Sequence, residues 1–298
     1  MKKILLAAIL FAGFSLVSCA QEKSSLGLEL RVVTSNVRYM TANDGQNSWE
    51  YRKDALADAL LSLDADIIGT QEAVAAQKAF LEEKLKDYKS VGVGRDDGKE
   101  KGEHSAIFYN AKRFKAIDSG NFWLSETPDV PSLGWDAACV RVASWAFLEE
   151  KSSGKRFFFV NTHLDHVGVV ARHEGVSLLV KKAHEIGAGC PMVITGDFNI
   201  YNDSQEIERI KEMGLIHAYD IAAEKKLQKA SWHGYSEDID KHVQDVNKSN
   251  GRDIPVPQII DYIFISQGTC SYYEIMDPRG PQGVFLSDHS PVFADITL

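Results

Sequence analysis

Apolar and polar residues follow two different periods along the chain, and these periods predict strands and helices in turn. Residues 28–37 alternate with a period of two and are rich in β-branched side chains, which is typical of a strand. Residues 49–63 place Leu56, Leu60 and Leu63 on one helix face. The same patterns predict further helices at 74–85, 172–186 and 205–213, and strands at 66–69, 88–94, 105–109, 117–124, 140–149, 155–162, 192–195, 257–266, 269–276 and 292–298. This alternation indicates an α/β protein.

Two pairs of short segments resemble each other and indicate an internal repeat. Residues 32–36 (VVTSN) resemble 159–163 (FVNTH), and residues 67–72 (IIGTQE) resemble 193–199 (VITGDFN). We therefore expect two sheets packed face to face with helices outside, in one domain over residues 28–298. Residues 219–254 are polar and longer than an ordinary connection, so we expect a functional or partly mobile loop there.

The first nineteen residues have the pattern of an export signal. A basic start precedes an apolar run over 4–14 that is too short to span a membrane. The run ends in Leu16-Val17-Ser18-Cys19, which resembles a bacterial lipobox. We expect an exported lipoprotein of a Gram-negative-type bacterium, facing the periplasm or the cell surface, with Cys19 lipidated and residues 20–27 as a tether. An ordinary signal peptide is the alternative.

The net negative charge of the chain, and the motifs that its sequence lacks, disfavour several classes of ligand and enzyme. The 298 residues carry a formal net charge of -9, and removal of the signal with Lys2 and Lys3 lowers it to about -11. An acidic surface repels nucleic acid and anionic lipid over most of its area. The sequence contains no Cys-x-x-Cys pair, no Gly-x-Ser-x-Gly elbow, no His-Glu-x-x-His and no Gly-x-Gly-x-x-Gly after a strand. These absences disfavour a zinc enzyme, a serine hydrolase and a dinucleotide-dependent oxidoreductase.

Polar residues with metal-binding or acid–base capacity repeatedly follow buried strands. Asn36, Glu72, His163 and Asp197 with Asn199 lie at or after the end of such a strand, whereas Asp261 opens a late apolar run and Asp288 with His289 precedes the last strand. Because ligands bind at the carboxyl ends of strands in α/β sheets, we expect these residues to meet in one pocket. Individually, Glu72 also suits the acidic start of a helix, Asn36 a turn, and Asp197-x-Asn199 a helix cap.

The ordered set of Asn36, Gln71-Glu72, Asn161-Thr162-His163, Gly196-Asp197-Phe198-Asn199, Ile260-Asp261-Tyr262 and Ser287-Asp288-His289 resembles the endonuclease/exonuclease/phosphatase superfamily, the deoxyribonuclease I-like group. The resemblance spans residues 28–298 and is nearest the carbon catabolite repressor type deadenylase-like branch. It implies a four-layer αββα sandwich and metal-dependent hydrolysis of a phosphoester.

The resemblance also implies roles for these residues. Glu72 would be the principal ligand of Mg²⁺, or of Mn²⁺, with Asn36 and Asp288 close by. Asp197 would orient or deprotonate the attacking water, and Asn199 and His163 would contact the phosphate. His289, held by Asp261, would serve in acid–base work or charge stabilisation. Such oxygen-rich sets suit Mg²⁺, and phosphoester cleavage requires charge neutralisation together with a base.

Three further residues are candidates for substrate binding. Arg141 is expected either to clamp a phosphate or to lie on a surface strand, and Arg172 either to pair with Asp165 or to lie on a solvated helix face. His233 lies in a segment that resembles a Thr-Phe-His-Gly segment of the family, and we expect it to pack within its loop.

Several substrate classes remain open at this stage. We expect a monomeric phosphoesterase that cleaves a phosphodiester or a phosphomonoester by attack of water, on a phosphorylated small molecule or a nucleic acid. An exported nuclease, either a 3'-5' exonuclease or an endonuclease, is an alternative within the family. A binding-only surface lipoprotein is the alternative from a different class.

Overall fold

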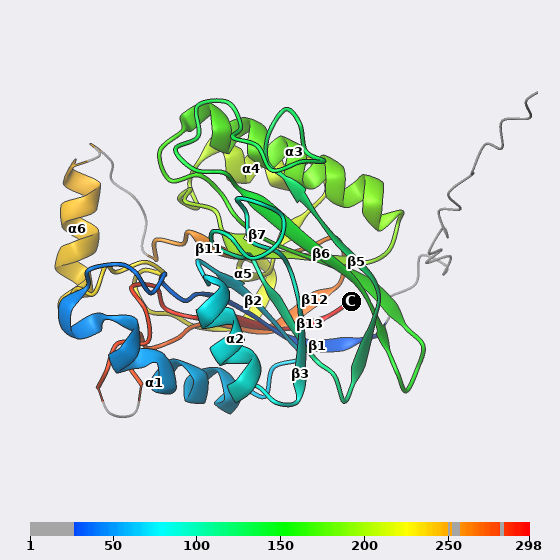
Figure 1. The fold of residues 1–298 in the computed structure, drawn as a ribbon, viewed down its shortest axis with the longest axis horizontal. Coiled ribbons are helices and arrows are strands. Elements are labelled where there is room, and N and C mark those ends of the chain that lie inside the picture. The colour runs from blue at the N-terminus through cyan, green and yellow to red at the C-terminus, as the bar shows by residue number, and fades with distance from the viewer. Residues whose placement is uncertain (1–26, 250, 252–256, 281–282) are drawn as a thin grey trace, which may run out of the picture.

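The period-two segments of the chain form two β-sheets that pack face to face (Figure 1). This computed structural model describes residues 27–249, 251, 257–280 and 283–298. The predicted signal peptide with Cys19, and all of the predicted tether except Gly27, lie outside the described residues.

The first sheet has seven strands, and both of its faces are covered. Their order is β10 (Ala222–Lys226), β12 (Thr269–Ile275), β13 (Val292–Thr297), β1 (Glu29–Asn36), β2 (Ile67–Gln71), β4 (Ile107–Asn110) and β3 (Tyr88–Val91). β1 and β2 run parallel, whereas β1 and β13 run antiparallel. Val32 packs in the core between the sheets, while Val33 packs in the core on the opposite face. This explains why β1 is apolar on both faces.

The second sheet has six strands and contains the predicted hairpin. Their order is β5 (Phe114–Trp123), β6 (Val142–Glu150), β7 (Arg156–His163), β8 (Met192–Asp197), β11 (Asp261–Ile265) and β9 (Ile216–His217). β6 and β7 form the antiparallel hairpin, and β7 and β8 are parallel. The pair β7–β8 therefore repeats the arrangement of β1–β2, as the internal resemblance predicts.

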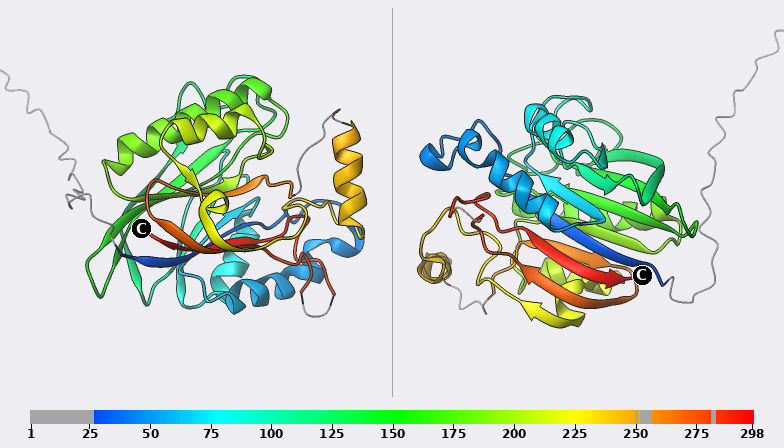
Figure 2. Two further views of the ribbon diagram at one scale, coloured as in Figure 1. Left: turned by 180° about the vertical axis from the view of Figure 1, so that it is seen from behind. Right: turned by 90° about the horizontal axis from the view of Figure 1, so that it is seen from below.

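Helices cover the outer face of each sheet (Figures 1 and 2). α1 (Trp49–Ser62) and α2 (Ala75–Lys84) pack on the first sheet, and α3 (Val169–Gly187) and α4 (Gln205–Glu212) pack on the second. The predicted αββα sandwich is confirmed. Within the described ranges, no helix has the length and apolar character needed to cross a membrane.

The segment 219–254 contains more structure than a loop. The short α5 (Ala218–Ile221) leads into β10, which pairs parallel with β12, and α6 (Ile239–Ser249) follows. In its described part this segment therefore contains helices and a strand that the sequence analysis did not predict. β10 is an edge strand with four exposed residues, so the hydrophobic pattern that identifies buried strands is missing there.

Gly69 lies where the two sheets approach each other beneath the strand ends. A Cβ atom there would lie 2.6 Å from Oδ1 of Asn161 and would also collide with Oγ1 of Thr195. Gly69→Ala is therefore expected to lower the free energy of unfolding by about 1–3 kcal/mol, measured by urea denaturation. Gly175→Ala is the control, because its Cβ would meet only ordinary contacts at 3.7 Å or more inside α3. Equal stability of the two variants would contradict this explanation.

Candidate active site

The ends of four central strands, two from each sheet, bring the predicted site residues to one edge of the sandwich. Asn36 ends β1, and Glu72 directly follows β2, which is parallel to it. His163 ends β7 opposite Asp197 at the end of β8, and Asp261 begins β11 on the other side of Asp197. The carboxyl ends of parallel strands thus supply one polar cluster.

Asp197 connects the two sheets within this cluster. Its Oδ2 accepts a hydrogen bond of 2.9 Å from Nδ2 of Asn36, which also donates one of 3.0 Å to Oε1 of Glu72. Its Oδ1 accepts a hydrogen bond of 2.9 Å from the backbone N–H of Asn199. Asp197 is only 1% exposed, and this burial raises the pKa of its carboxyl group well above the usual range. A carboxylate in this state is suited to accept a proton near neutral pH.

His289 lies between two buried carboxylates. Its Nδ1 is 2.9 Å from Oδ2 of Asp261, and its Nε2 is 3.6 Å from Oδ2 of Asp197. Burial by itself lowers the imidazole pKa, but the two carboxylates outweigh it and raise the pKa of His289 above its ordinary value. The ring is therefore a cation at neutral pH, and Asp261 fixes its orientation.

His163 and Asn199 form the opposite side of the cluster. Nδ2 of Asn199 lies 3.0 Å from Nε2 of His163 and donates 3.1 Å to the carbonyl of Leu164. Nε2 of His163 is also 3.4 Å from Oδ2 of Asp197. Burial, reinforced by the charge of Arg141, lowers the pKa of His163 well below its usual value. His163 is therefore neutral, in contrast to His289.

Three residues at the strand ends adopt left-handed backbone conformations. The φ angles are 53° at Arg38, 64° at Glu72 and 50° at Asn199. Such conformations cost about 1–3 kcal/mol each and persist where the surroundings hold them. Here Oδ1 of Asn36 accepts a hydrogen bond from the N–H of Arg38, and Oε2 of Glu72 accepts one from the N–H of Tyr39. These hydrogen bonds tie the backbone of Arg38 and Tyr39 to Asn36 and Glu72.

Asp288 lies close to Arg38. Its Oδ2 is 3.6 Å from Nη1 of Arg38, whose guanidinium also binds both carboxylate oxygens of Asp44 at 3.0 and 3.1 Å. In the described part of the chain, Asp288 belongs to no group of three ligand-type side chains within 4.8 Å of one another.

His233 packs within its loop and holds the backbone of Asp288. The imidazole ring of His233 is fully buried and stacks on Phe285. The backbone N–H of His233 donates a hydrogen bond of 3.0 Å to the carbonyl of Asp288. The backbone of Trp232 forms a β-bridge with His289. The segment around His233 therefore positions the loop that carries His289.

Arg141 and Arg172 contact different groups of Asp165: Arg141 lies at its carboxylate, and Arg172 binds its backbone carbonyl. Arg141 is 4% exposed, its Nε lies 3.3 Å from Oδ2 of Asp165, and its Nη2 lies 2.9 Å from Nδ1 of His166. The surface-strand alternative for Arg141 is therefore wrong. Nη1 of Arg172 donates 3.2 Å to the backbone carbonyl of Asp165. Of the two alternatives for Arg172, the ion pair with Asp165 is wrong, because Arg141 binds that carboxylate.

Asp165→Asn is expected to lower the free energy of unfolding at pH 7 by about 2–3 kcal/mol, because it removes a buried charged acceptor. The carboxylate accepts hydrogen bonds from the N–H groups of Gly168, Val167, Ala138 and Cys139. Burial by itself raises the pKa of Asp165, but these donors and Arg141 lower it to about 2. A lowered carboxyl pKa stabilises the fold above the ordinary value of 3.8, and this contribution is lost as pH falls toward 2. Urea denaturation of both proteins should show a difference that shrinks below about pH 4; a pH-independent difference would contradict this.

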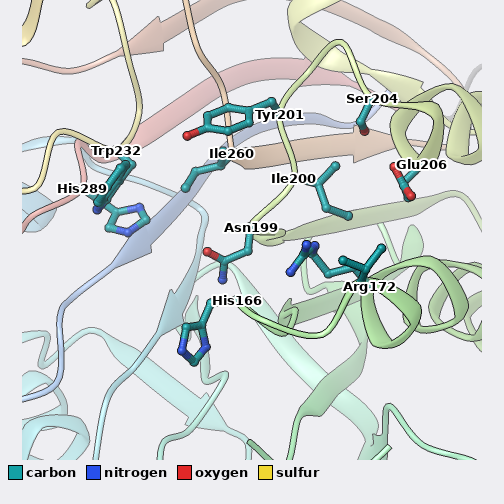
Figure 3. A pocket seen from close by; sticks show the side chains of 11 residues that line it. His166, Arg172, Asn199, Ile200, Tyr201, Ser204, Glu206, Trp232, Ile260 and His289 are labelled. Carbon is teal, nitrogen blue, oxygen red and sulfur yellow. The ribbon is translucent and has the colours of Figure 1, made fainter. Parts of the chain in front are cut away.

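A pocket of about 550 Å³ adjoins the cluster (Figure 3). Asn199 and His289 contribute to its wall, so the pocket opens directly onto the polar side chains. The other lining residues are His166, Val169, Arg172, Ile200, Tyr201, Ser204, Glu206, Trp232 and Ile260. Pockets of this size hold small molecules.

The potential metal-ligand atoms around Glu72 suit a hard divalent cation. Ligand atoms of Glu72, Asp197 and His163 lie within 4.8 Å of one another. Carboxylate oxygens are the ligands that Mg²⁺ and Mn²⁺ prefer. Asn36 turns its Nδ2 toward both carboxylates, while its Oδ1 accepts from Arg38, so ligation through Oδ1 requires rotation of this amide. Glu72 and Asp197 could therefore hold a cation directly, with Asn36 beside them.

The sequence analysis missed several residues that border the site. Nη1 of Arg95 lies 2.6 Å from Oε2 of Glu103, and that oxygen is 3.9 Å from Nδ1 of His163. Burial raises the pKa of Glu103. Neither Glu103 nor Arg38 ends an apolar strand, so the signal that identified the other residues is absent there.

The comparison with known protein families matches the same part of the chain that carries the site residues. The model of the Endonuclease/Exonuclease/phosphatase family matches residues 33–289, from β1 to His289. The chain belongs to this family. The resemblance seen in the sequence is thereby confirmed.

Members of the endonuclease/exonuclease/phosphatase family from Bacteroides are similar in structure. One from Bacteroides vulgatus has a TM-score of 0.82 and 37% identity, and covers 91% of this chain and 99% of its own. A mannosyl-6-phosphatase from Bacteroides thetaiotaomicron has a TM-score of 0.80 and 33% identity, and covers 90% and 100%.

A nuclease of the family is also similar. The CCR4-Not complex 3'-5'-exoribonuclease subunit Ccr4 of Emericella nidulans is 30% identical over 135 residues, which cover 39% of this chain and 20% of that protein. The chain spans less than two thirds of the length of the curated relatives it matches, at most 59%. Phosphatases and nucleases of this family both cleave phosphoric esters. Membership of this family therefore supports a hydrolase of phosphoric esters over a protein that only binds its ligand.

Proposed function

We propose that this protein is a Mg²⁺-dependent phosphoesterase, with Mn²⁺ as a possible substitute, that hydrolyses a small phosphorylated molecule by attack of water. One observation carries the proposal. Asp197 contacts Asn36 on one side and lies near His163 and His289 on the other, and the wall of the adjoining pocket, which admits a small molecule, includes His289.

Each side chain has a proposed role that follows from its charge. Asp197 accepts a proton from the attacking water, because its raised pKa suits a base. His289, charged and held by Asp261, stabilises negative charge or donates a proton. Asn199 and neutral His163 donate hydrogen bonds to phosphate oxygens. Glu72, with Asn36, would hold the cation, which when bound neutralises the negative charge of the phosphoryl group.

A phosphomonoester of a small molecule is the favoured substrate. The mature chain carries about -11 charges, which disfavours a long polyanion. The similarity to a mannosyl-6-phosphatase supports a sugar phosphate. An exported nuclease is the second candidate, supported by the similarity to Ccr4.

A substrate panel tests the proposal. The form starting at Gln21 would be assayed with Mg²⁺ or Mn²⁺ on mannose 6-phosphate, 4-nitrophenyl phosphate, bis(4-nitrophenyl) phosphate and single-stranded RNA. We expect metal-dependent hydrolysis of the monoesters and its loss in EDTA. Activity that persists in EDTA would refute the metal dependence, and a preference for RNA would favour the nuclease.

We also propose that Cys19 carries a lipid anchor. The support is the Leu-Val-Ser-Cys motif at the end of the apolar run. In cells fed radioactive palmitate, the wild-type protein should be labelled and Cys19→Ala should not. Persistent labelling of Cys19→Ala would refute the anchor, whereas Cys139→Ala is the control expected to retain the label.

A further inference from the structure

The end of the pocket away from His289 carries a cation and an anion that do not pair with each other. Arg172 and Glu206 both line this end, together with Ser204 (Figure 3). Among the described residues, Arg172 has no carboxylate within 4.0 Å, and the hydrogen bond of its guanidinium goes to the backbone carbonyl of Asp165. Oε1 of Glu206 lies 3.6 Å from Nδ1 of His173.

The combination of an arginine and a glutamate at this end of the pocket favours one chemical class of ligand. A guanidinium only donates hydrogen bonds, and a carboxylate only accepts them. A hydroxyl group does both, so neighbouring hydroxyls satisfy Arg172 and Glu206 together. A second phosphate would satisfy Arg172 but would be repelled by Glu206. The other wall, with Trp232 and Ile260, offers apolar surface for the carbon face of a ring.

We propose that Arg172 and Glu206 bind the hydroxyl groups of a sugar or cyclitol phosphate, and that Glu206 excludes substrates with a second phosphate. This inference rests on the proposed phosphoesterase function. It concerns the part of the substrate that the phosphate-binding residues do not contact. In this proposal, Glu206 is a specificity-determining residue.

A stabilising role for Glu206 is the alternative. Acidic residues in the first turn stabilise a helix, and both Glu206 and Glu208 occupy the first turn of α4. Glu208 is exposed and pairs with Lys211 at 3.0 Å instead of lining the pocket. Glu208→Gln is therefore a matched control, because it removes the same charge from the same helix turn.

The experiment measures kcat and KM for mannose 6-phosphate, fructose 1,6-bisphosphate and 4-nitrophenyl phosphate with Mg²⁺. Relative to the aryl ester, Glu206→Gln should lower kcat/KM for mannose 6-phosphate by about 10- to 100-fold, mainly through KM, since hydrogen bonds to a charged group are lost. The same variant should raise relative kcat/KM for the bisphosphate. Inhibition by free mannose should weaken in parallel, and Glu208→Gln should change none of these values.

The outcomes separate the two proposals. If the wild type hydrolyses 4-nitrophenyl phosphate but Glu206→Gln leaves the substrate ratios unchanged, the specificity role is overturned and the phosphoesterase function stands. A wild-type preference for nucleoside monophosphates over hexose phosphates also overturns it. If no ester is hydrolysed with Mg²⁺ or Mn²⁺, the proposed function itself is refuted.

Discussion

Asp197→Asn is expected to lower kcat by about 10²- to 10⁴-fold while leaving the fold intact. Asn has the same shape, and its single oxygen can accept a hydrogen bond from either Asn36 or the N–H of Asn199, which bind different oxygens of Asp197. It cannot take a proton from water, and it removes one of the two carboxylates that hold the charge on His289. The measurement is kcat at saturating substrate and Mg²⁺, with thermal denaturation to verify folding.

Asp203→Asn is the matched control for this prediction. Asp203 is exposed and lies six residues further along the chain, so its replacement should change kcat by less than about twofold. If Asp197→Asn retained more than a tenth of wild-type kcat with an unchanged Tm, the role of Asp197 as base would have to be abandoned.

Glu72→Gln is expected to weaken binding of Mn²⁺ and to lower kcat/KM by about 10²- to 10⁴-fold. The substitution keeps the side-chain length but removes the charge next to Asn36 and Asp197. Calorimetric titration with Mn²⁺ measures the affinity without substrate, so the effect on the metal is separated from the effect on catalysis.

Glu83→Gln, on the exposed side of α2, is the control and should bind Mn²⁺ as the wild type does. Wild-type affinity for Mn²⁺ in Glu72→Gln would show that this carboxylate is not a ligand. The metal would then have to be held by Asp197 and His163, the other members of the same group.

Predictions from the sequence were most successful where one local signal was sufficient. Apolar strands such as β1 and β8 are buried on both faces, so their composition identifies them and marks Asn36 and Asp197 at their ends. The roles of the arginines were less predictable. Arg141 and Arg172 both lie near Asp165, and only their packing decides which one binds its carboxylate.

Outside residues 216–249, the sequence by itself determined the order of the main strands and helices; it also determined the family and the polar residues at the ends of buried strands. Each of these depends on the periodicity of a short segment or on the order of motifs. Only the tertiary structure decided which polar groups touch. Asn36 reaches Asp197 across 161 residues, and Asp261 reaches His289 across 28, because the two sheets pack face to face. Packing between distant segments also produces the left-handed turns, the contact of Asp288 with Arg38, and the pocket with Arg172 and Glu206. No local sequence pattern encodes these features.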